Sequence, residues 1–347
     1  MKDFIRRKGM NLVIGAGDVR VTLRGANIEY SAGENPFTTD NEDDYIQLKK
    51  VGLNSGRLHL DYTYFEDDNR PFEYKETGFA FVDNQINRAR KHGINIILDM
   101  HYAQCGWQVE DTDFWQAGSE LQERFIRMWQ AIAERYRDEP LVVAYDLINE
   151  PKADQNFADY EAVLNKTIEA IRSVDQNHLI WIEVPVHNEE MLPKIEDTNI
   201  IYDFHMYRPH SFTHQRIQGP IIEKWPSLLR EPGWFDLKDL HVGGEIRSPA
   251  LKEYPLSDKG REYVENCVLP SIEWARKNDY PLVCGEFGVA STCVDHGGEE
   301  WVTDVLRVLE NNDVHYYYYS LRWKAPGKDF ATFGLFKNAL KKLKPGL

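Results

Sequence analysis

The stretch INIILDMH, residues 94–101, decides the fold class of this 347-residue chain. It is an almost continuous apolar run, and such runs of four to eight residues are typical of strands buried on both faces of a parallel sheet. Seven further runs of the same kind occur along the chain, at residues 21–28, 55–60, 141–149, 179–184, 199–206, 281–289 and 315–321. The sequence therefore predicts eight buried parallel strands.

Longer amphipathic stretches separate these runs and predict helices. Ser119-Glu-Leu-Gln122 has a capping-box pattern, and apolar residues then recur every three or four positions up to Tyr136. The same periodicity occurs between Phe157 and Ile171 and between Trp301 and Leu309. This alternation predicts an α/β fold, a (β/α)8 TIM barrel that forms a single domain over residues 1–347. A doubly wound sheet is the main rival, but no G-x-G-x-x-G follows the first run to support it.

Two segments lie outside the alternation. Residues 11–23 have the pattern of a β-hairpin that turns on Gly15 to Asp18, and we expect it to cover the N-terminal face of the barrel. Residues 208–260 form a long, proline-containing insertion between the sixth and seventh strands. It would leave the barrel at the C-terminal face, where the active sites of such barrels are built.

Composition and charge exclude several classes of protein. The chain has 41 Lys and Arg against 56 Asp and Glu, a net charge of −15, which argues against a nucleic-acid partner because phosphate binding needs a basic surface. No apolar run approaches the ~18 residues of a membrane helix, so no membrane partner is expected. The four cysteines, Cys105, Cys267, Cys284 and Cys293, form no C-x-x-C pair and are expected to be thiols in or near the core.

Polar residues stand at or just after the ends of several predicted strands, where packing explains them poorly because burying an unpaired charge costs several kcal/mol. They are Arg57, His101, Asn149, Glu150, His205, Tyr207 and Glu286. Each has a structural alternative: Arg57 as an ion-pair partner, His101 as a satisfied core histidine, Glu150 as a helix cap. Because the C-terminal ends of barrel strands share one face, the set together predicts a functional site.

Two carboxylates dominate the chemistry of this set, Glu150 after the fourth strand and Glu286 after the seventh. Glycoside hydrolysis needs one carboxylic acid to protonate the leaving oxygen and one carboxylate to attack or to activate water. Arg57, His205 and Tyr207 offer the charge and hydrogen bonds that would keep Glu286 ionised. The Asn149 amide is placed to donate to a sugar 2-hydroxyl.

Two other classes of protein compete with this interpretation. A metal-dependent hydrolase could use His59, Asp99, His101 and His205, but the chain has no H-x-H or H-E-x-x-H motif, and Arg57 beside these residues would repel a cation. We therefore expect no metal site. The second rival is a sugar-binding barrel without catalysis, which nothing in the sequence favours because both carboxylates are present.

The chain resembles glycoside hydrolase family 5 from residue 25 to about residue 336. Six segments carry the resemblance: GANIEY (25–30), GRLHLDY (56–62), LDMHYA (98–103), DLINEP (146–151), FHMYRPHSFTHQ (204–215) and CGEFGV (284–289). Asn-Glu-Pro alone is a weak motif, but the order and spacing of these segments are specific. The resemblance implies that Glu150 is the acid/base and Glu286 the nucleophile. It implies supporting, substrate-contacting roles for Arg57, His101, Asn149, His205 and Tyr207.

One segment departs from the family. The eighth strand usually offers a tryptophan as the floor under the reacting sugar, whereas Tyr319 stands at that place here and Trp323 follows it. Either ring can stack on a sugar, so both are candidates for the floor. Trp107 and Trp225 are further candidates for the cleft. Asn27 and Glu29, which end the first strand, are expected near sugar hydroxyls.

The resemblance implies a retaining β-glycoside hydrolase that acts by double displacement on an oligo- or polysaccharide, without a cofactor. The FTHQ segment is most similar to bacterial endoglucanases, which favours β-1,4-linked glucan. An exo-acting β-glucosidase and a β-mannanase of the same family are the alternatives, and the insertion at 208–260 could close one end of the cleft. We expect a monomer, either cytoplasmic and acting on imported oligosaccharides or secreted with its leader removed, since no signal peptide is recognisable.

Overall fold

The computed structural model describes most of the chain, and every structural statement below refers to that part. The described residues are 3–30, 35–39, 41–104, 106–107, 109, 113–153, 157–185, 193, 195–215, 224–227, 241–242, 245–246, 259–322 and 333–343.

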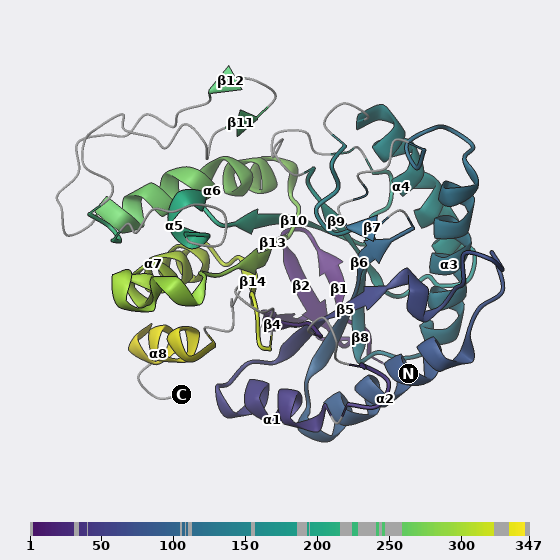
Figure 1. Ribbon diagram of the computed structural model, residues 1–347, viewed down its shortest axis with the longest axis horizontal. Coiled ribbons are helices and arrows are strands. Elements are labelled where there is room, and N and C mark those ends of the chain that lie inside the picture. Colours follow the sequence, from purple (N-terminus) through teal and green to yellow (C-terminus); the bar gives the residue numbers. More distant parts are fainter. Residues whose placement is uncertain are drawn as a thin grey trace.

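Eight parallel strands close into a barrel, as the sequence predicts (Figure 1). Each strand pairs with its neighbours, and the last pairs with the first through Tyr316 to Tyr318 against Arg24 to Ala26. In chain order the barrel strands are β4 (Arg24–Ile28), β5 (Ser55–Asp61), β6 (Asn95–Ala103), β8 (Val142–Asp146), β9 (Leu179–Glu183), β10 (Ile200–Met206), β13 (Leu282–Phe287) and β14 (His315–Tyr318). The (β/α)8 prediction is confirmed, and the doubly wound alternative is wrong.

Helices surround the barrel on its outside (Figure 1). The capping box predicted at the start of α3 is present, since the Ser119 side chain accepts a hydrogen bond of 3.3 Å from the Gln122 backbone N–H. The helices are α1 (Glu42–Lys50), α2 (Glu76–His92), α3 (Glu120–Tyr136), α4 (Phe157–Arg172), α5 (His210–Thr213), α6 (Lys259–Asn278), α7 (Gly298–Asn311) and α8 (Phe333–Leu343), with short 3-10 turns at Tyr62–Tyr64 and Ser291–His296. None of these helices is long and apolar enough to cross a membrane.

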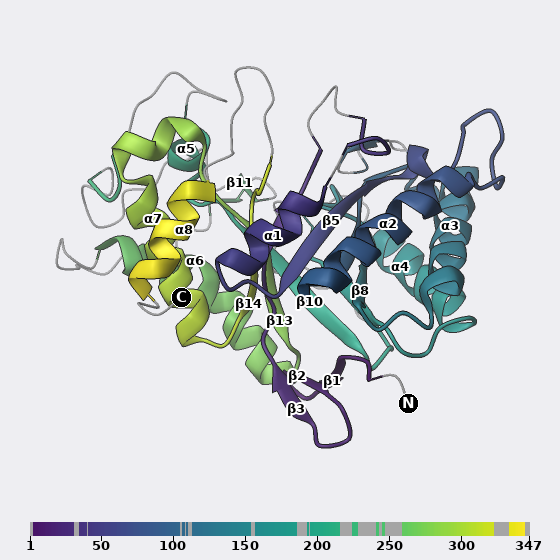
Figure 2. The same ribbon diagram turned by 90° about the horizontal axis from the view of Figure 1, so that it is seen from below.

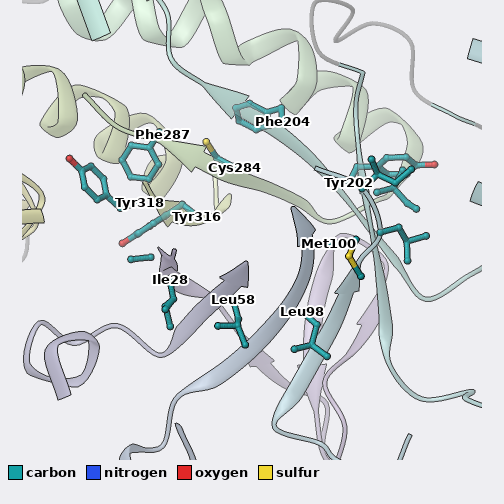
Figure 3. Packing of buried hydrophobic residues seen from close by; sticks show 14 of the residues in the cluster. Ile28, Leu58, Leu98, Met100, Tyr202, Phe204, Cys284, Phe287, Tyr316 and Tyr318 are labelled. Atoms are coloured by element: carbon teal, nitrogen blue, oxygen red, sulfur yellow. The ribbon is translucent and has the colours of Figure 1, made fainter. Parts of the chain in front are cut away.

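Side chains alternate between the two faces of each barrel strand, with period two. On β5 and β6 the outward residues Leu58, Leu98 and Met100 pack beneath the helices, together with residues of β10, β13 and β14 (Figure 3). A second, smaller cluster joins residues of non-adjacent strands, among them Ile97 and Leu179, and therefore fills the lower barrel interior. The remaining inward positions, nearer the carboxyl ends of the strands, are polar.

A small antiparallel sheet closes the N-terminal end of the barrel (Figure 2). Its strands are β1 (Arg6–Lys8), β2 (Asn11–Ile14) and β3 (Val19–Val21). The predicted hairpin is β2 and β3, and Leu12 packs with the apolar residues of the lower interior. The strand β1 was not predicted because its sequence, Arg-Arg-Lys, carries no apolar alternation.

The long insertion is described only in part. Besides α5, the structure describes residues 224–227 and the short pair β11 (His241–Val242) and β12 (Glu245–Ile246), and α6 begins at Lys259. Another short strand, β7 (Gly106–Trp107), pairs antiparallel with the end of β6. Three cysteines, Cys267, Cys284 and Cys293, are free and buried as predicted, and Cys105 lies outside the described residues.

Candidate active site

The structure brings Glu150 and Glu286 together at the carboxyl end of the barrel. Glu286 lies on β13, and Glu150 follows β8. His205 on β10 joins them, with its Nδ1 2.8 Å from Glu150 Oε1 and 3.6 Å from Glu286 Oε2. A carboxylate oxygen of Glu150 lies within 4.8 Å of one of Glu286. Residues 136 positions apart in the sequence thus face the same small space.

Two donors hold the Glu286 carboxylate. Arg57 Nη1 donates to Oε1 over 2.8 Å, and the Tyr207 hydroxyl donates to Oε2 over 2.8 Å. Burial and the neighbouring Glu286 charge raise the pKa of Tyr207 well above its usual value, so the phenol keeps its proton and remains a donor. Both hydrogen bonds fix the position of the Glu286 carboxylate.

The FTHQ segment positions Tyr207. Thr213 Oγ1 donates to the Tyr207 carbonyl oxygen over 2.6 Å, and the His214 ring lies 5.1 Å from the Tyr207 ring. The Ala290 backbone N–H, just after β13, donates to the Thr213 carbonyl over 2.7 Å. This segment therefore ties the loop after β10 to the strand that carries Glu286.

Glu150 occupies an unusual backbone conformation. Its φ is +44°, in the left-handed region that non-glycine residues rarely adopt. The Glu150 backbone N–H donates to Glu183 Oε2 over 2.6 Å, which fixes the turn after β8. Burial alone would lower the pKa of His205, but the charges of Glu286, Glu183 and Asp203 raise it well above its usual value. His205 is therefore cationic near neutral pH and donates to Glu150.

Arg57 is the centre of the polar interior. It is fully buried on β5, as its third residue rather than at the predicted strand end. Its guanidinium binds two amide oxygens, those of Asn27 at 2.8 Å and Asn149 at 2.9 Å. It also faces four carboxylates: Asp146 at 2.8 Å, Glu183 at 2.7 Å, Glu286 at 2.8 Å and Asp99 at 3.2 Å. Burial raises the pKa of both Asp146 and Glu183 well above the usual carboxyl value.

We expect Arg57→Met to lower the free energy of unfolding by about 3–5 kcal/mol, because it leaves several buried carboxylates without their cation. The matched control is Arg24→Met, which breaks the half-buried ion pair with Glu310 at 2.7 Å and should cost at most about 1 kcal/mol. Urea unfolding of the three proteins measures both values. Equal losses in the two variants would show that Arg57 is no more than an ordinary ion-pair partner.

His101 belongs to a layer of polar residues beneath the two glutamates. Its Nδ1 lies 2.9 Å from Asp99 Oδ2, and its ring stacks on His59 with centroids 3.8 Å apart. Asn149 Nδ2 lies 3.5 Å from His101 Nε2. His59, Asp99 and His101 are close enough to hold a metal ion, but the Arg57 cation already lies 3.2 Å from the same Asp99 oxygen. The arginine therefore supplies the positive charge that a metal would bring.

Tyr319 lies at the rim of this site, directly after β14. The half-buried ring is 6.2 Å from the Tyr207 ring and 6.0 Å from the His59 ring, measured between centroids. The hydroxyl of Tyr319 donates to Glu29 Oε2 over 2.6 Å. Burial raises the pKa of Glu29 to about 7, and the negative charges of Glu286 and Asp99 contribute to this rise. The charge of His101 and the hydrogen bond from Tyr319 lower the pKa in part.

The pKa of Glu29 predicts a pH-dependent stability. Between about pH 4.5 and 7 the unfolded chain loses the Glu29 proton while the folded chain keeps it, so ionisation disfavours folding as the pH rises. The free energy of unfolding of Glu29→Gln minus that of wild type should therefore be larger at pH 8 than at pH 5, by about 2 kcal/mol. Urea unfolding of both proteins at the two pH values measures this. The same stability difference at both values would contradict the raised pKa.

The structure places most, but not all, of the predicted site residues together. Arg57, His101, Asn149, His205, Tyr207 and Tyr319 surround the two glutamates or their immediate partners. Trp323 lies outside the described residues, as does the side chain of Trp107, whose backbone is on β7. Trp225 is not in the cleft: it is 2 % exposed, and its Nε1–H donates to Asp304 over 3.0 Å.

Sequence reasoning missed three acidic residues of the site, Asp146, Glu183 and Asp203. Each is a carboxylate on a buried strand, and Glu183, the next-to-last residue of the predicted run LIWIEV, ends β9 and could have been selected by the same rule as the other residues. Asp203 accepts hydrogen bonds from the Gly285 backbone N–H over 2.6 Å and from Trp181 Nε1 over 2.8 Å. A side chain at Gly285 would collide with the Asp203 carboxylate, which explains the glycine before Glu286.

Comparison with known proteins gives consistent matches. The model of the family described as Cellulase (glycosyl hydrolase family 5) matches residues 16–325. Endoglucanase C of Acetivibrio thermocellus is 27 % identical over 280 residues, which cover 79 % of this chain and 81 % of that protein. Cellodextrinase A of Ruminococcus flavefaciens is 23 % identical over 282 residues, which cover 79 % and 76 %. A solved structure of Thermotoga maritima Cel5A with mannotriose shares the fold, with a TM-score of 0.68, 23 % identity, and coverage of 92 % of this chain and 97 % of that one.

Proposed function

Since the chain belongs to glycosyl hydrolase family 5 and is therefore a glycoside hydrolase, we propose that it cleaves β-1,4-linked glucan as a retaining endo-β-1,4-glucanase. In this proposal Glu286 is the nucleophile and Glu150 the acid/base. The remaining residues around them orient the sugar and keep the two carboxyl groups in opposite protonation states.

The distance between Glu150 and Glu286 carries this proposal. Retaining enzymes hold their two carboxyl groups about 5–5.5 Å apart, whereas inverting enzymes need roughly 6.5–9.5 Å to admit a water molecule. The oxygens of Glu150 and Glu286 that lie within 4.8 Å of one another support direct attack by a carboxylate. Like charges so close disfavour double ionisation, so one group retains a proton.

In the first step, a Glu286 oxygen attacks the anomeric carbon and forms a glycosyl ester while the bond to the leaving oxygen breaks. Arg57 and Tyr207 bond the Glu286 carboxylate, which favours it as the charged partner. Glu150, the half-buried partner, then carries the proton and passes it to the leaving oxygen. Asn149, with its Oδ1 fixed by Arg57, is placed to bond the sugar 2-hydroxyl.

In the second step, water attacks the anomeric carbon, the ester bond to Glu286 breaks, and Glu150 accepts the proton of the water. Once Glu286 is esterified, its negative charge no longer opposes ionisation of Glu150, and the cationic His205 at 2.8 Å from Glu150 Oε1 stabilises the carboxylate that this step requires. One side chain thus serves as the acid and then as the base, and the enzyme returns to its starting charge.

The substrate is proposed from the similarity to Endoglucanase C and from the FTHQ segment. The experiment is a product profile on soluble β-1,4-glucan, β-mannan and aryl β-glucosides, with and without a strong chelator. We expect a spread of oligosaccharide lengths from glucan and no effect of the chelator. Glucose as the sole early product would instead indicate an exo-acting enzyme, faster turnover of mannan would indicate a mannanase, and loss of activity with the chelator would indicate a metal enzyme.

A further inference from the structure

The residue that replaces the expected tryptophan after β14 is anchored by a partner from the opposite end of the chain. The Tyr319 hydroxyl donates to Glu29 Oε2 over 2.6 Å, which is a short hydrogen bond. Glu29 follows β4, and β4 and β14 are paired neighbours in the barrel. The bond fixes the free end of a single aromatic ring that would otherwise turn about two side-chain torsions.

One carboxylate oxygen of Glu29, Oε2, accepts the hydrogen bond from Tyr319, and the other, Oε1, does not take part in it. Among the residues that the structure describes, Glu29 Oε1 has no hydrogen-bond partner, although the side chain is only 7 % exposed. Residues of the active site influence Glu29, because the charges of His101 and Glu286 both shift the pKa of its carboxyl group. Glu29 Oε1 is therefore able to accept a hydrogen bond from a bound ligand.

The position of Glu29 relative to the Tyr319 ring suggests what it binds. A pyranose stacked on an aromatic ring presents its C–H face to the ring and its equatorial hydroxyls around the rim. Glu29 contacts Tyr319 at the hydroxyl, which is the edge of the aromatic ring. A sugar resting on Tyr319 would therefore bring a rim hydroxyl toward Glu29.

We propose that Glu29 and Tyr319 form a sugar-recognition pair, in which Tyr319 supports the sugar bound next to Glu286 and Glu29 Oε1 accepts a hydrogen bond from one of its equatorial hydroxyls. The proposal rests on the proposed function for the presence of a sugar at this place. It assigns Tyr319 as the floor, and it makes Glu29 a determinant of specificity for sugars with a hydroxyl in the ring plane, such as glucose.

The test is a cycle between protein and substrate. Wild type, Glu29→Ala, Tyr319→Phe and the double variant are assayed for kcat/KM on an aryl β-glucoside or β-cellobioside and on its 3-, 4- and 6-deoxy analogues in the reacting sugar. We expect Glu29→Ala to lose roughly 10- to 100-fold on the parent substrate. With wild type, the analogue that lacks the bonded hydroxyl should show a loss of kcat/KM of the same size. With Glu29→Ala, that analogue should have nearly the same kcat/KM as the parent substrate. The fold-loss of kcat/KM in the double variant should be smaller than the product of the fold-losses in Glu29→Ala and Tyr319→Phe.

Tyr316→Phe is the matched control. Tyr316 is on β14, three residues before Tyr319, and its hydroxyl donates to a glutamate, Glu310, over 2.9 Å, but it belongs to the apolar layer outside the barrel. This variant should keep kcat/KM within about twofold, since it removes an equivalent bond away from the site. Glu29→Gln serves as a second variant that retains the shape of the side chain if Glu29→Ala does not fold.

Two outcomes would overturn the pair. If the Glu29 variants discriminate among the deoxy analogues as wild type does, Glu29 binds no sugar hydroxyl. If the losses in Glu29 and Tyr319 variants multiply, the two residues do not act together. Both outcomes require an active wild type, so they differ from failure of the proposed function, in which wild type itself would leave the parent glycoside intact.

Discussion

Glu286→Gln is expected to lower kcat by roughly 10⁴-fold or more on every substrate, with the fold intact. The amide cannot form the glycosyl ester, while it keeps the size of the side chain, and its remaining oxygen can still accept the hydrogen bond from Arg57 although its NH2 group cannot accept the one from Tyr207. The measurement is steady-state hydrolysis of an aryl β-cellobioside, together with circular dichroism and thermal unfolding. Retention of more than about a tenth of the wild-type rate would remove Glu286 from the role of nucleophile.

Glu310→Gln is the control for this variant. Glu310 also accepts hydrogen bonds from an arginine and a tyrosine, Arg24 at 2.7 Å and Tyr316 at 2.9 Å, but it lies on α7, outside the barrel. It should leave kcat close to that of wild type. A similar loss in both variants would mean that the substitution acts through stability rather than through chemistry.

Glu150→Ala is expected to divide substrates by their leaving group. On glucan, which needs protonation of the leaving oxygen, kcat should fall by about 10²–10⁴-fold. On a dinitrophenyl glycoside, which leaves without a proton, the glycosyl ester on Glu286 should still form and then accumulate. Added azide needs no general base, so it should raise the rate and give a β-glycosyl azide.

The azide product separates this account from its alternatives. A β-glycosyl azide places the nucleophile on one face and Glu150 on the other, as double displacement requires. No acceleration by azide, or equal losses on the two kinds of leaving group, would contradict the acid/base role of Glu150. His205→Ala should be a weaker version of the same variant, since the imidazole lies closer to Glu150, at 2.8 Å, than to Glu286, at 3.6 Å.

The barrel could be predicted because each of its strands is an apolar run that differs from the amphipathic helices around it. The same property marks the site, since polar residues interrupt these runs only where they point inward. Stepping by two from His101 finds Asp99, and stepping by two from His205 finds Asp203, on the same inward faces. The period-two alternation of the strands therefore predicts these inward acidic residues, although they do not stand at the strand ends.

Contacts between distant segments could not be predicted in this way. The Tyr319–Glu29 bond joins residues 290 positions apart, and no local pattern marks either as the partner of the other. Trp225 was placed in the cleft because it lies in the insertion, yet its ring packs near Phe212 and Tyr263 and its N–H finds Asp304, 79 positions away. Local propensity fixes the elements, whereas such pairs depend on how the closed barrel brings the elements together.

The central claim is that two carboxyl groups in opposite protonation states act from either side of one anomeric carbon. The most direct measurement is the proton NMR spectrum of the hydrolysis of a β-linked cellooligosaccharide, recorded before mutarotation. The account predicts that the first reducing sugar carries the β configuration and only later equilibrates with the α form. Initial release of the α anomer would show inversion and would contradict the role given to Glu286.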